Sequence, residues 1–394
     1  MNHQLIVSSL FFLLACYVGL RVFQYLPIRP SLKWVLFFVY LFCSETFLIH
    51  QLADKAGVLE QIPKWLSLGL SAAQACCIVL ALLSLAREAV LIIWFTFGRP
   101  FFHPVLRDPE KARNLWLGWM QKLSVALCIA AVLITAKGVH NAVQAPRVVE
   151  VEIHSPRIPP SLDGFKIAQL SDLHVWSGFD ASWLREIVGL VGALDPDMIV
   201  ITGDTLDGRA MRMQGELAPL GELEAPQGVY VVDGNHEYLG SYESWLEYMN
   251  TVSGHTLLRN EGEILRIGEA GLGVAGVTDL EGEQEWEGPD LKKAYEAVKE
   301  ADYKILLWHR PKEAKLAAEA GFDLMLAGHT HGGQFFPGNL LAAVQSGYAS
   351  GLYEVDGMAL YVNPGSSLWG RVPLRLGVRS EITLFVLRSE QSSD

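Results

Sequence analysis

The second part of this chain lacks cysteine. All five cysteines lie within the first 128 residues, namely Cys16, Cys43, Cys76, Cys77 and Cys128. Beyond residue 128 the sequence therefore excludes a disulfide framework and a zinc site ligated by cysteine. The absence of disulfides is compatible with either side of a membrane, so it does not assign a compartment.

Basic residues are also scarce in the second part, where acidic residues dominate. The first 145 residues hold 12 basic and six acidic residues, which leaves 19 basic and 37 acidic residues, a net charge of −18, for residues 146–394. Proteins that act on nucleic acids use basic surfaces because phosphate backbones are anionic. The composition therefore argues against a nucleic acid partner. Divalent cations would reverse the negative sign locally at a metal site.

Long hydrophobic runs are confined to the first part. Four runs lie near residues 5–25, 33–51, 66–86 and 117–137, and each is close to the roughly 20 residues that cross a bilayer. The first lacks the basic start and the small-residue cleavage site of a secretory signal, so we expect it to be retained. The runs predict a four-helix transmembrane region over residues 1–145 and a separate domain over residues 146–394. The protein would be integral to the inner or plasma membrane.

Basic residues in the connections predict the orientation of this region. Arg29 and Lys33 lie between the first two runs. Five more basic residues lie between the third and fourth runs, namely Arg87, Arg99, Arg107, Lys111 and Arg113. Cytoplasmic loops carry the excess of Lys and Arg. Both connections are therefore expected in the cytoplasm, with both termini and the second domain on the periplasmic or extracellular side.

One acidic residue, Glu45, lies inside the second hydrophobic run. Ionisable residues within a membrane are candidates for function. The alternative is a carboxyl group that pairs with a neighbouring helix or lies near an interface, as the polar neighbours Ser44 and His50 suggest. The sequence leaves both interpretations open.

The second domain alternates apolar runs with helical segments. The runs over 148–153, 165–174, 197–204, 228–237, 304–311 and 323–333 have the composition of strands, and most end in polar clusters. Helical periodicity occurs over 182–194, 244–250, 289–301 and 311–320. Strands that repeatedly end in polar clusters predict an α/β architecture with its site at the carboxyl ends of the strands.

Five short blocks carry the candidate chemistry. They are Asp172-Leu-His174, Gly203-Asp204, Gly234-Asn235-His236-Glu237, His309 and Gly328-His329-Thr-His331. Residues two apart on an extended segment can face one site. The glycines precede ligands where we expect the backbone to turn tightly. Together the blocks supply enough Asp, Asn and His side chains for two divalent ions about 3.5–4 Å apart.

The order and content of these blocks resemble the calcineurin-like metallophosphoesterase superfamily, over roughly residues 160–385. The resemblance implies two packed β-sheets flanked by helices in an α/β (α+β) domain. It also implies two divalent metal ions, with Mn, Fe and Zn all suited to such ligands. The first ion would be held by Asp172, His174 and His331, and the second by Asn235, His309 and His329. Asp204 would bridge both ions, and His236 would contact the phosphate and protonate the leaving oxygen.

The C-terminal stretch resembles a membrane-attached subgroup of that superfamily. It contains Tyr-Val-Asn-Pro-Gly from residue 361 and Pro-Leu-Arg-Leu from residue 373, with Ser380 in place of the usual proline. Arg371 and Arg375 either bind a phosphate or an anionic headgroup or are surface arginines paired with acids. Asp207 either orients a ligand histidine or terminates a turn. His154 and His255 are assigned no role.

These features predict a membrane-anchored phosphoesterase with a dinuclear metal centre. It would use a metal-activated water to hydrolyse a phosphoester or pyrophosphate bond, in a lipid or a lipid-linked substrate, with specificity in loops such as 205–228 and 335–350. One alternative is a cytoplasm-facing hydrolase of nucleotide-linked lipid precursors or nucleotides. The other is a membrane sensor or scaffold without catalysis.

Overall fold

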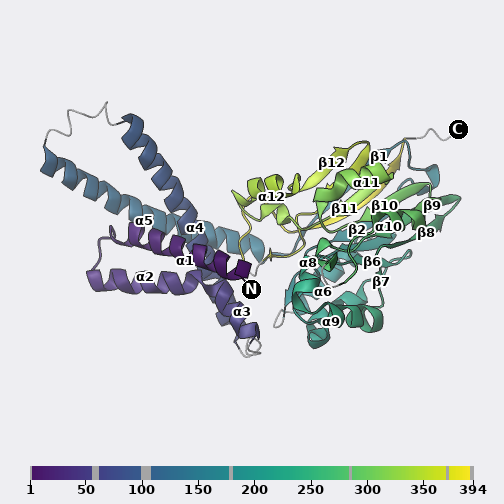
Figure 1. Cartoon of the computed structure of the whole chain (residues 1–394), viewed down its shortest axis with the longest axis horizontal. Coiled ribbons are helices and arrows are strands. Elements are labelled where there is room, and N and C mark those ends of the chain that lie inside the picture. The colour runs from purple at the N-terminus through teal and green to yellow at the C-terminus, as the bar shows by residue number, and fades with distance from the viewer. Residues whose placement is uncertain are drawn as a thin grey trace. The chain divides into compact units, whose positions relative to one another are not determined.

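The computed structural model describes residues 2–55, 62–98, 108–176, 181–283, 286–369 and 372–390 (Figure 1). The chain divides into two compact units. One comprises Met1–Asn141 with Gly370–Leu374, and the other comprises Ala142–Trp369 with Arg375–Asp394.

The N-terminal unit is helical. Its helices are α1 (Asn2–Phe23), α2 (Pro30–Ser44), α3 (Thr46–Lys55), α4 (Lys64–Ile93) and α5 (Pro109–Ala142), and a π-helical turn (Trp94–Gly98) follows α4. Among the described residues, Trp65–Phe97 and Pro109–Ala142 are long and apolar enough to cross a membrane, and Phe11–Phe23 and Pro30–Ser44 are shorter apolar helices. The third and fourth predicted runs are therefore candidate spans, and the four-helix region stays a prediction.

The length of the second hydrophobic run suggested one continuous helix, but the structure divides it into two. Glu45 interrupts it between α2 and α3. Gln74 of α4 donates a hydrogen bond from Nε2 to the Ser44 carbonyl (3.2 Å), and Thr46 donates from Oγ1 to the Cys43 carbonyl (2.8 Å). Side chains thus satisfy carbonyl oxygens that the interruption frees, which an apolar environment requires.

The second unit contains two six-stranded mixed sheets. The first has the order β1 (Arg147–Ser155), β14 (Glu381–Ser389), β2 (Lys166–Leu170), β4 (Met198–Thr202), β6 (Val229–Val232) and β7 (Thr256–Leu257). The second has the order β12 (Gly351–Val355), β13 (Met358–Val362), β11 (Leu324–Ala327), β10 (Tyr303–Leu307), β9 (Ala270–Gly276) and β8 (Glu261–Ile267). A separate two-stranded sheet is formed by β3 (Val175–Trp176), which follows β2 in the chain, and β5 (Leu206–Asp207), which follows β4.

Four neighbouring strands of each sheet are parallel to one another. In the first sheet β2, β4, β6 and β7 run in one direction, and in the second β9, β10, β11 and β13 do so. β14 is antiparallel to β2, and the edge strands β8 and β12 are antiparallel to their neighbours. Carboxyl ends of parallel strands meet at one edge of a sheet. The segments that follow β2, β4 and β6, and those that follow β10 and β11, are therefore brought together.

Three apolar clusters hold the two sheets and their helices in layers. Side chains from both sheets, including Ile167, Val200 and Ile305, form the cluster between them. The outer face of the first sheet packs on α6 (Ala181–Gly192) and α9 (Tyr242–Tyr248), and that of the second packs on α10 (Leu291–Val298) and α11 (Ala314–Ala320). The near-continuous apolar strands fit this arrangement, because each strand is covered on both faces. The predicted α/β architecture is confirmed.

Candidate metal centre

The candidate ligands lie directly after parallel strands. Asp172 and His174 follow β2, Asp204 follows β4, and Asn235 follows β6 at the start of α8 (Asn235–Gly240). His309 follows β10, and His329 and His331 follow β11. Five of these residues have a positive φ, namely Asp172, His174, Asp204, His329 and His331. This backbone conformation is costly for residues other than glycine and is concentrated at functional sites, so the backbone itself is bent to converge these side chains.

Two glycines in the blocks serve different purposes. Gly203 has a φ of +87°, so the tight turn expected there is present. Gly234 has an extended backbone with a φ of −120°. A side chain at Gly234 would collide with the backbone and carboxylate of Asp204 and would come within 2.9 Å of the His309 ring. Close approach between segments, rather than a turn, therefore requires the glycine at 234.

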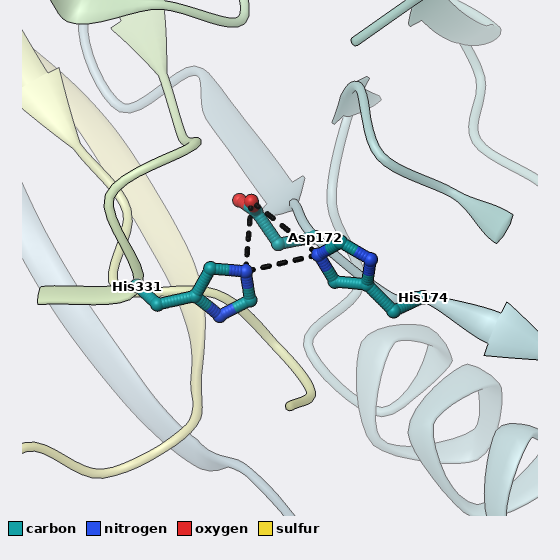
Figure 2. Close-up of side chains that lie close together, drawn as sticks. All are labelled: Asp172, His174 and His331. Carbon is teal, nitrogen blue, oxygen red and sulfur yellow. Dashed lines mark hydrogen bonds and ion pairs between the residues drawn. The ribbon is translucent and has the colours of Figure 1, made fainter. Parts of the chain in front are cut away.

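Asp172, His174 and His331 form the first group of donors (Figure 2). The Nε2 atoms of His174 and His331 are 2.9 Å apart, and His331 Nε2 lies 3.2 Å from Asp172 Oδ1. His174 Nε2 lies 4.0 Å from the same Asp172 oxygen. All three side chains are buried. Three donor atoms from the ends of two strands thus surround one point.

Asp204, His309 and His329 form the second group. His309 Nε2 lies 3.2 Å from Asp204 Oδ2 and 3.2 Å from His329 Nδ1. The same Asp204 oxygen lies 3.7 Å from His174 Nε2 of the first group. Asp204 is therefore the side chain that the two groups share.

The donor atoms suit divalent metal ions. In each group two imidazole nitrogens face each other, and a shared divalent cation accepts the lone pairs of both rings when both are neutral. Asn235 adds a carbonyl oxygen, Oδ1, that is buried and has no hydrogen-bond partner among the described residues. A buried acceptor without a partner is costly, and coordination would satisfy it. Mixed imidazole, carboxylate and amide donors fit the divalent ions of this kind of centre without selecting one.

Burial and charge set the protonation of these groups. Burial lowers the pKa of His329 and of His331 to about 4, so both rings are neutral at pH 7, as metal ligands must be. Burial opposes ionisation of Asp204, but the facing rings of His309 and His236 outweigh it and hold its pKa well below the ordinary value. Burial also acts against a charged His309, yet Asp204 raises the pKa of that ring to about 10. A metal ion bound by His309 would therefore displace a proton.

Hydrogen bonds outside the donor groups fix the orientation of the rings. His309 donates from Nδ1 to the Thr202 carbonyl (2.7 Å), which directs Nε2 toward Asp204. His174 donates from Nδ1 to Asp207 Oδ1 (2.9 Å), which directs Nε2 toward the first group. Such partners raise the basicity of ligand histidines and select their tautomer. The structure thus supports the orienting role for Asp207 over the turn-terminating one.

His236 lies next to the donor groups and is held by both aspartates. Its backbone N–H donates to Asp204 Oδ1 (2.9 Å), and its Nδ1 donates to Asp207 Oδ1 (2.6 Å). Burial lowers the pKa of the ring, but Asp204 and Asp207 outweigh burial and raise it to about 9. Its ring meets that of His174 edge to face, with centroids 4.5 Å apart. The side chain is 18% exposed, so it borders both the buried donors and the solvent.

Glu237 belongs to one of the blocks, yet the sequence suggested no role for it. Its buried carboxylate accepts hydrogen bonds from the backbone N–H groups of Gly234 (2.7 Å), Asp204 (3.1 Å) and Thr205 (2.6 Å). The side chain therefore joins the loop after β4 to the loop after β6. Its position directly after the other polar residues of the block was the available signal.

Neither interpretation of Arg375 was correct. The side chain is fully buried and is neither a surface group nor open to a headgroup. Its guanidinium donates to the carbonyls of Pro364 (2.9 Å) and His331 (3.2 Å), and also to that of Ser367. Burial lowers its pKa to about 10. Arg375 thus holds the backbone of a candidate ligand, and Arg371 lies outside the described residues.

Comparisons with known proteins agree with this geometry. Residues 165–333 match the family described as Calcineurin-like phosphoesterase. A zebrafish relative named "Transmembrane protein with metallophosphoesterase domain" is 36% identical over 69% of this chain, and the match spans 64% of that relative's length.

A bacterial relative and a solved structure extend the comparison. An uncharacterised metallophosphoesterase of Campylobacter jejuni is 31% identical, over 72% of this chain and 73% of its own length. A 5'-nucleotidase precursor from Thermus thermophilus has a TM-score of 0.38 and 14% identity, over 56% of this chain and 54% of that one. Because a relative above 30% identity is covered over most of its length, the chain belongs to the calcineurin-like phosphoesterase family.

Proposed function

We propose that this chain is a membrane-anchored phosphoesterase with a dinuclear metal centre. Asp172, His174 and His331 would hold one ion, and Asn235, His309 and His329 the other, with Asp204 as the bridge. The observation that carries the proposal is the position of Asp204 Oδ2, which lies 3.2 Å from His309 Nε2 of one group and 3.7 Å from His174 Nε2 of the other. A carboxylate shared in this way is what two neighbouring ions require.

Bound divalent ions would supply an acidified water and would neutralise charge on the phosphoryl oxygens. The chain's own contribution begins with His236. Because Nδ1 of this ring is bound to Asp207, the proton available to a leaving oxygen is the one on Nε2. The raised pKa of His236, about 9, keeps that proton in place at neutral pH. Asp207 keeps His236 and His174 oriented together.

The substrate would be a phosphoester or pyrophosphate of a lipid or lipid-linked molecule. Two candidate spans, Trp65–Phe97 and Pro109–Ala142, support attachment to a membrane. Attachment raises the effective concentration of the hydrolase toward substrates held in the same bilayer. The excess of basic residues in the connections between the hydrophobic runs favours a domain outside the cytoplasm.

Substitution Asp204→Asn in the full-length protein tests the metal centre. We expect bound Mn²⁺, measured by elemental analysis, to fall, and hydrolysis of bis(p-nitrophenyl) phosphate to fall by more than about 100-fold, since even outer partners of ligands cost 10- to 100-fold. Asp356→Asn is the matched control, because Asp356 is an exposed aspartate that also has a positive φ (48°). Full activity and full metal content in Asp204→Asn would refute the proposal.

A further inference from the structure

The segment that follows the last ligand, His331, has no charged side chain. Residues 324–353 form a run of 30 positions without Asp, Glu, Lys or Arg, in a chain with 19% charged residues. About 25–35% of the surface residues of a soluble domain are of these four types. A segment that is exposed and carries no charge therefore has a surface suited to contact with an apolar environment.

The helix α12 (Gly338–Ser346) presents the apolar side chains of this segment to the surface. Leu340, Leu341 and Val344 are 54%, 61% and 83% exposed, and their spacing places them on one face of the helix. Phe336, two residues before the helix, is 70% exposed. These residues and Trp369, which is 56% exposed, are called the apolar surface below.

The apolar surface is built onto the metal centre. The turn His331–Gly333 leads into α12, and a side chain at Gly333 would collide with the backbone of Asn339 in the first turn of that helix. The segment closes on itself through Thr330, which donates a hydrogen bond to the Ala349 carbonyl. The surface therefore cannot shift freely with respect to the candidate ligand His331.

Trp369 is joined to the same segment by the side chain of Gln334, which follows the turn His331–Gly333. Gln334 is buried, donates from Nε2 to the Trp369 carbonyl (3.2 Å), and accepts from the Trp369 N–H at Oε1 (3.1 Å). Exposed tryptophan beside exposed aliphatic side chains is typical of surfaces that lie in the interfacial zone of a bilayer. Residues 363–370 also lack charged side chains.

The chain connection between the second candidate span and the second unit is short. Helix α5 contains the second candidate span and ends at Ala142, and β1 begins at Arg147. The four residues between them span at most about 14 Å. A domain attached this closely, with a net charge of −18 over residues 146–394, would approach an anionic bilayer best through a surface that carries no acidic side chain.

We propose that the apolar surface formed by Phe336, Leu340, Leu341, Val344 and Trp369 inserts into the bilayer that anchors the chain and admits lipid-borne phosphoesters to the metal centre. The inference rests on the proposed function and adds the element that gives access to a lipid. Insertion removes the exposed apolar side chains from water, and the fixed turn at His331 keeps the site beside the lipid headgroups.

Photolabelling tests insertion without requiring catalysis. The full-length protein is reconstituted into vesicles of phosphatidylcholine and phosphatidylglycerol that contain a phosphatidylcholine with a diazirine in its acyl chain. After irradiation we expect lipid adducts on the peptide that carries residues 336–346 and none on the peptide that carries Val252, an apolar residue 45% exposed elsewhere on the domain. Absence of adducts on residues 336–346 would overturn the inference, and a second copy or another partner would then cover the surface.

A pair of chromogenic esters tests access. Hexadecyl p-nitrophenyl phosphate resides in the vesicles, whereas bis(p-nitrophenyl) phosphate is soluble, and both release the same leaving group. We expect Val344→Glu to lower the rate on the hexadecyl ester by about tenfold and to leave the soluble diester within twofold, while the control Val252→Glu changes neither. Equal rates for Val344→Glu and the natural protein on the hexadecyl ester would contradict the access role. If the natural protein does not hydrolyse the soluble diester, the proposed function is refuted. The photolabelling result would still decide whether the surface inserts into the bilayer.

Discussion

A single carboxylate oxygen, Asp207 Oδ1, connects two histidines with different assigned roles. It accepts hydrogen bonds from His174 (2.9 Å) and from His236 (2.6 Å). The surrounding histidines hold the pKa of Asp207 far below its ordinary value despite its burial, so the carboxylate stays charged. Its negative charge favours the protonated form of His236, and its geometry fixes the ring of His174.

Asp207→Asn keeps the size of this side chain and removes its charge. We expect the rate of bis(p-nitrophenyl) phosphate hydrolysis to fall by about 10- to 100-fold. The carboxylate raises the pKa of His236, so its removal lowers that pKa. Activity depends on protonated His236, so in this variant it should begin to fall at a lower pH than in the natural protein. The alkaline limb of the pH–rate profile should therefore shift to lower pH.

A pH–rate profile of the purified full-length protein measures this shift, with Asp356→Asn as the control. A profile that keeps its alkaline limb, together with an unchanged rate, would show that Asp207 does not act through His236. A lower rate with an unshifted limb would restrict Asp207 to the orientation of His174.

At the scale of single residues, the sequence predicted which residues lie at the candidate site better than it predicted their hydrogen-bond partners. Asp172, Asp204 and His309 were recognisable because each follows an apolar run that ends at a strand terminus. Arg375 was misread because its partners are carbonyl groups of residues 331, 364 and 367, and backbone acceptors leave no mark in a sequence. The glycine at 234 was assigned to a turn for the same reason, since the segment it faces follows a different strand.

At the scale of elements, a buried network joins the ends of three strands. Asp233 follows β6 and accepts a hydrogen bond from the backbone N–H of Asp279, which follows β9 (2.7 Å). Asp279 in turn accepts two hydrogen bonds of 2.7 Å from Arg310, the neighbour of His309 after β10. The network lies directly beside the candidate ligands Asn235 and His309 in sequence. It therefore links the two sheets where their ligands must meet.

The carboxyl group of Asp233 gives this network a pH dependence. Burial raises its pKa to about 6, although hydrogen bonds from Tyr242, the Asp279 backbone and Tyr238 oppose the shift. Because the pKa is higher in the folded than in the unfolded state, the stabilisation is fully present below about pH 4 and is lost as the pH rises through 6. Asp233→Asn should remove this contribution, which amounts to at most about 3 kcal/mol.

Thermal unfolding of the full-length protein between pH 4 and pH 7 measures the effect. We expect the unfolding free energy of the natural protein to decline relative to that of Asp233→Asn across this range. Asp356→Asn, at an exposed turn, should follow the natural protein. Parallel curves for Asp233→Asn and the natural protein would show that Asp233 does not titrate as its surroundings imply.

Elements were predictable where one pattern dominated. The helices expected over 182–194 and 311–320 appear as Ala181–Gly192 and, after a 3₁₀ turn, Ala314–Ala320, because their apolar residues recur with helical spacing. The interruption at Glu45 was not predictable from hydropathy, since the Ser44 carbonyl beside it is satisfied by Gln74 from a distant helix. Network partners such as Asp279 and Arg310 lie 31 residues apart in sequence, and no local pattern connects them.

At the scale of the whole molecule, the N-terminal unit fixes the relative directions of its helices. Arg21, near the end of α1, pairs with Glu88, near the end of α4, at 2.9 Å, so these two helices end at the same level. Tyr40 of α2 donates to the Cys77 carbonyl of α4 (3.3 Å), whereas Gln74 reaches Ser44. Later residues of α2 thus meet earlier residues of α4, and α2 runs opposite to both α1 and α4.

The basic residues near the ends of α1 and α4 predict the side of the membrane that the C-terminus occupies. The paired ends of α1 and α4 carry Arg21 and Arg87. Arg107 and the start of α5, which carries Lys111 and Arg113, follow α4 in the chain. Basic residues are retained in the cytoplasm, so α5 would cross outward and deliver the second unit to the opposite side. Fusions after Asp394 should therefore activate a reporter that works only outside the cytoplasm and leave a cytoplasmic reporter silent. The reverse result would place the metal centre in the cytoplasm, where nucleotide-linked lipid precursors would become the first substrates to assay.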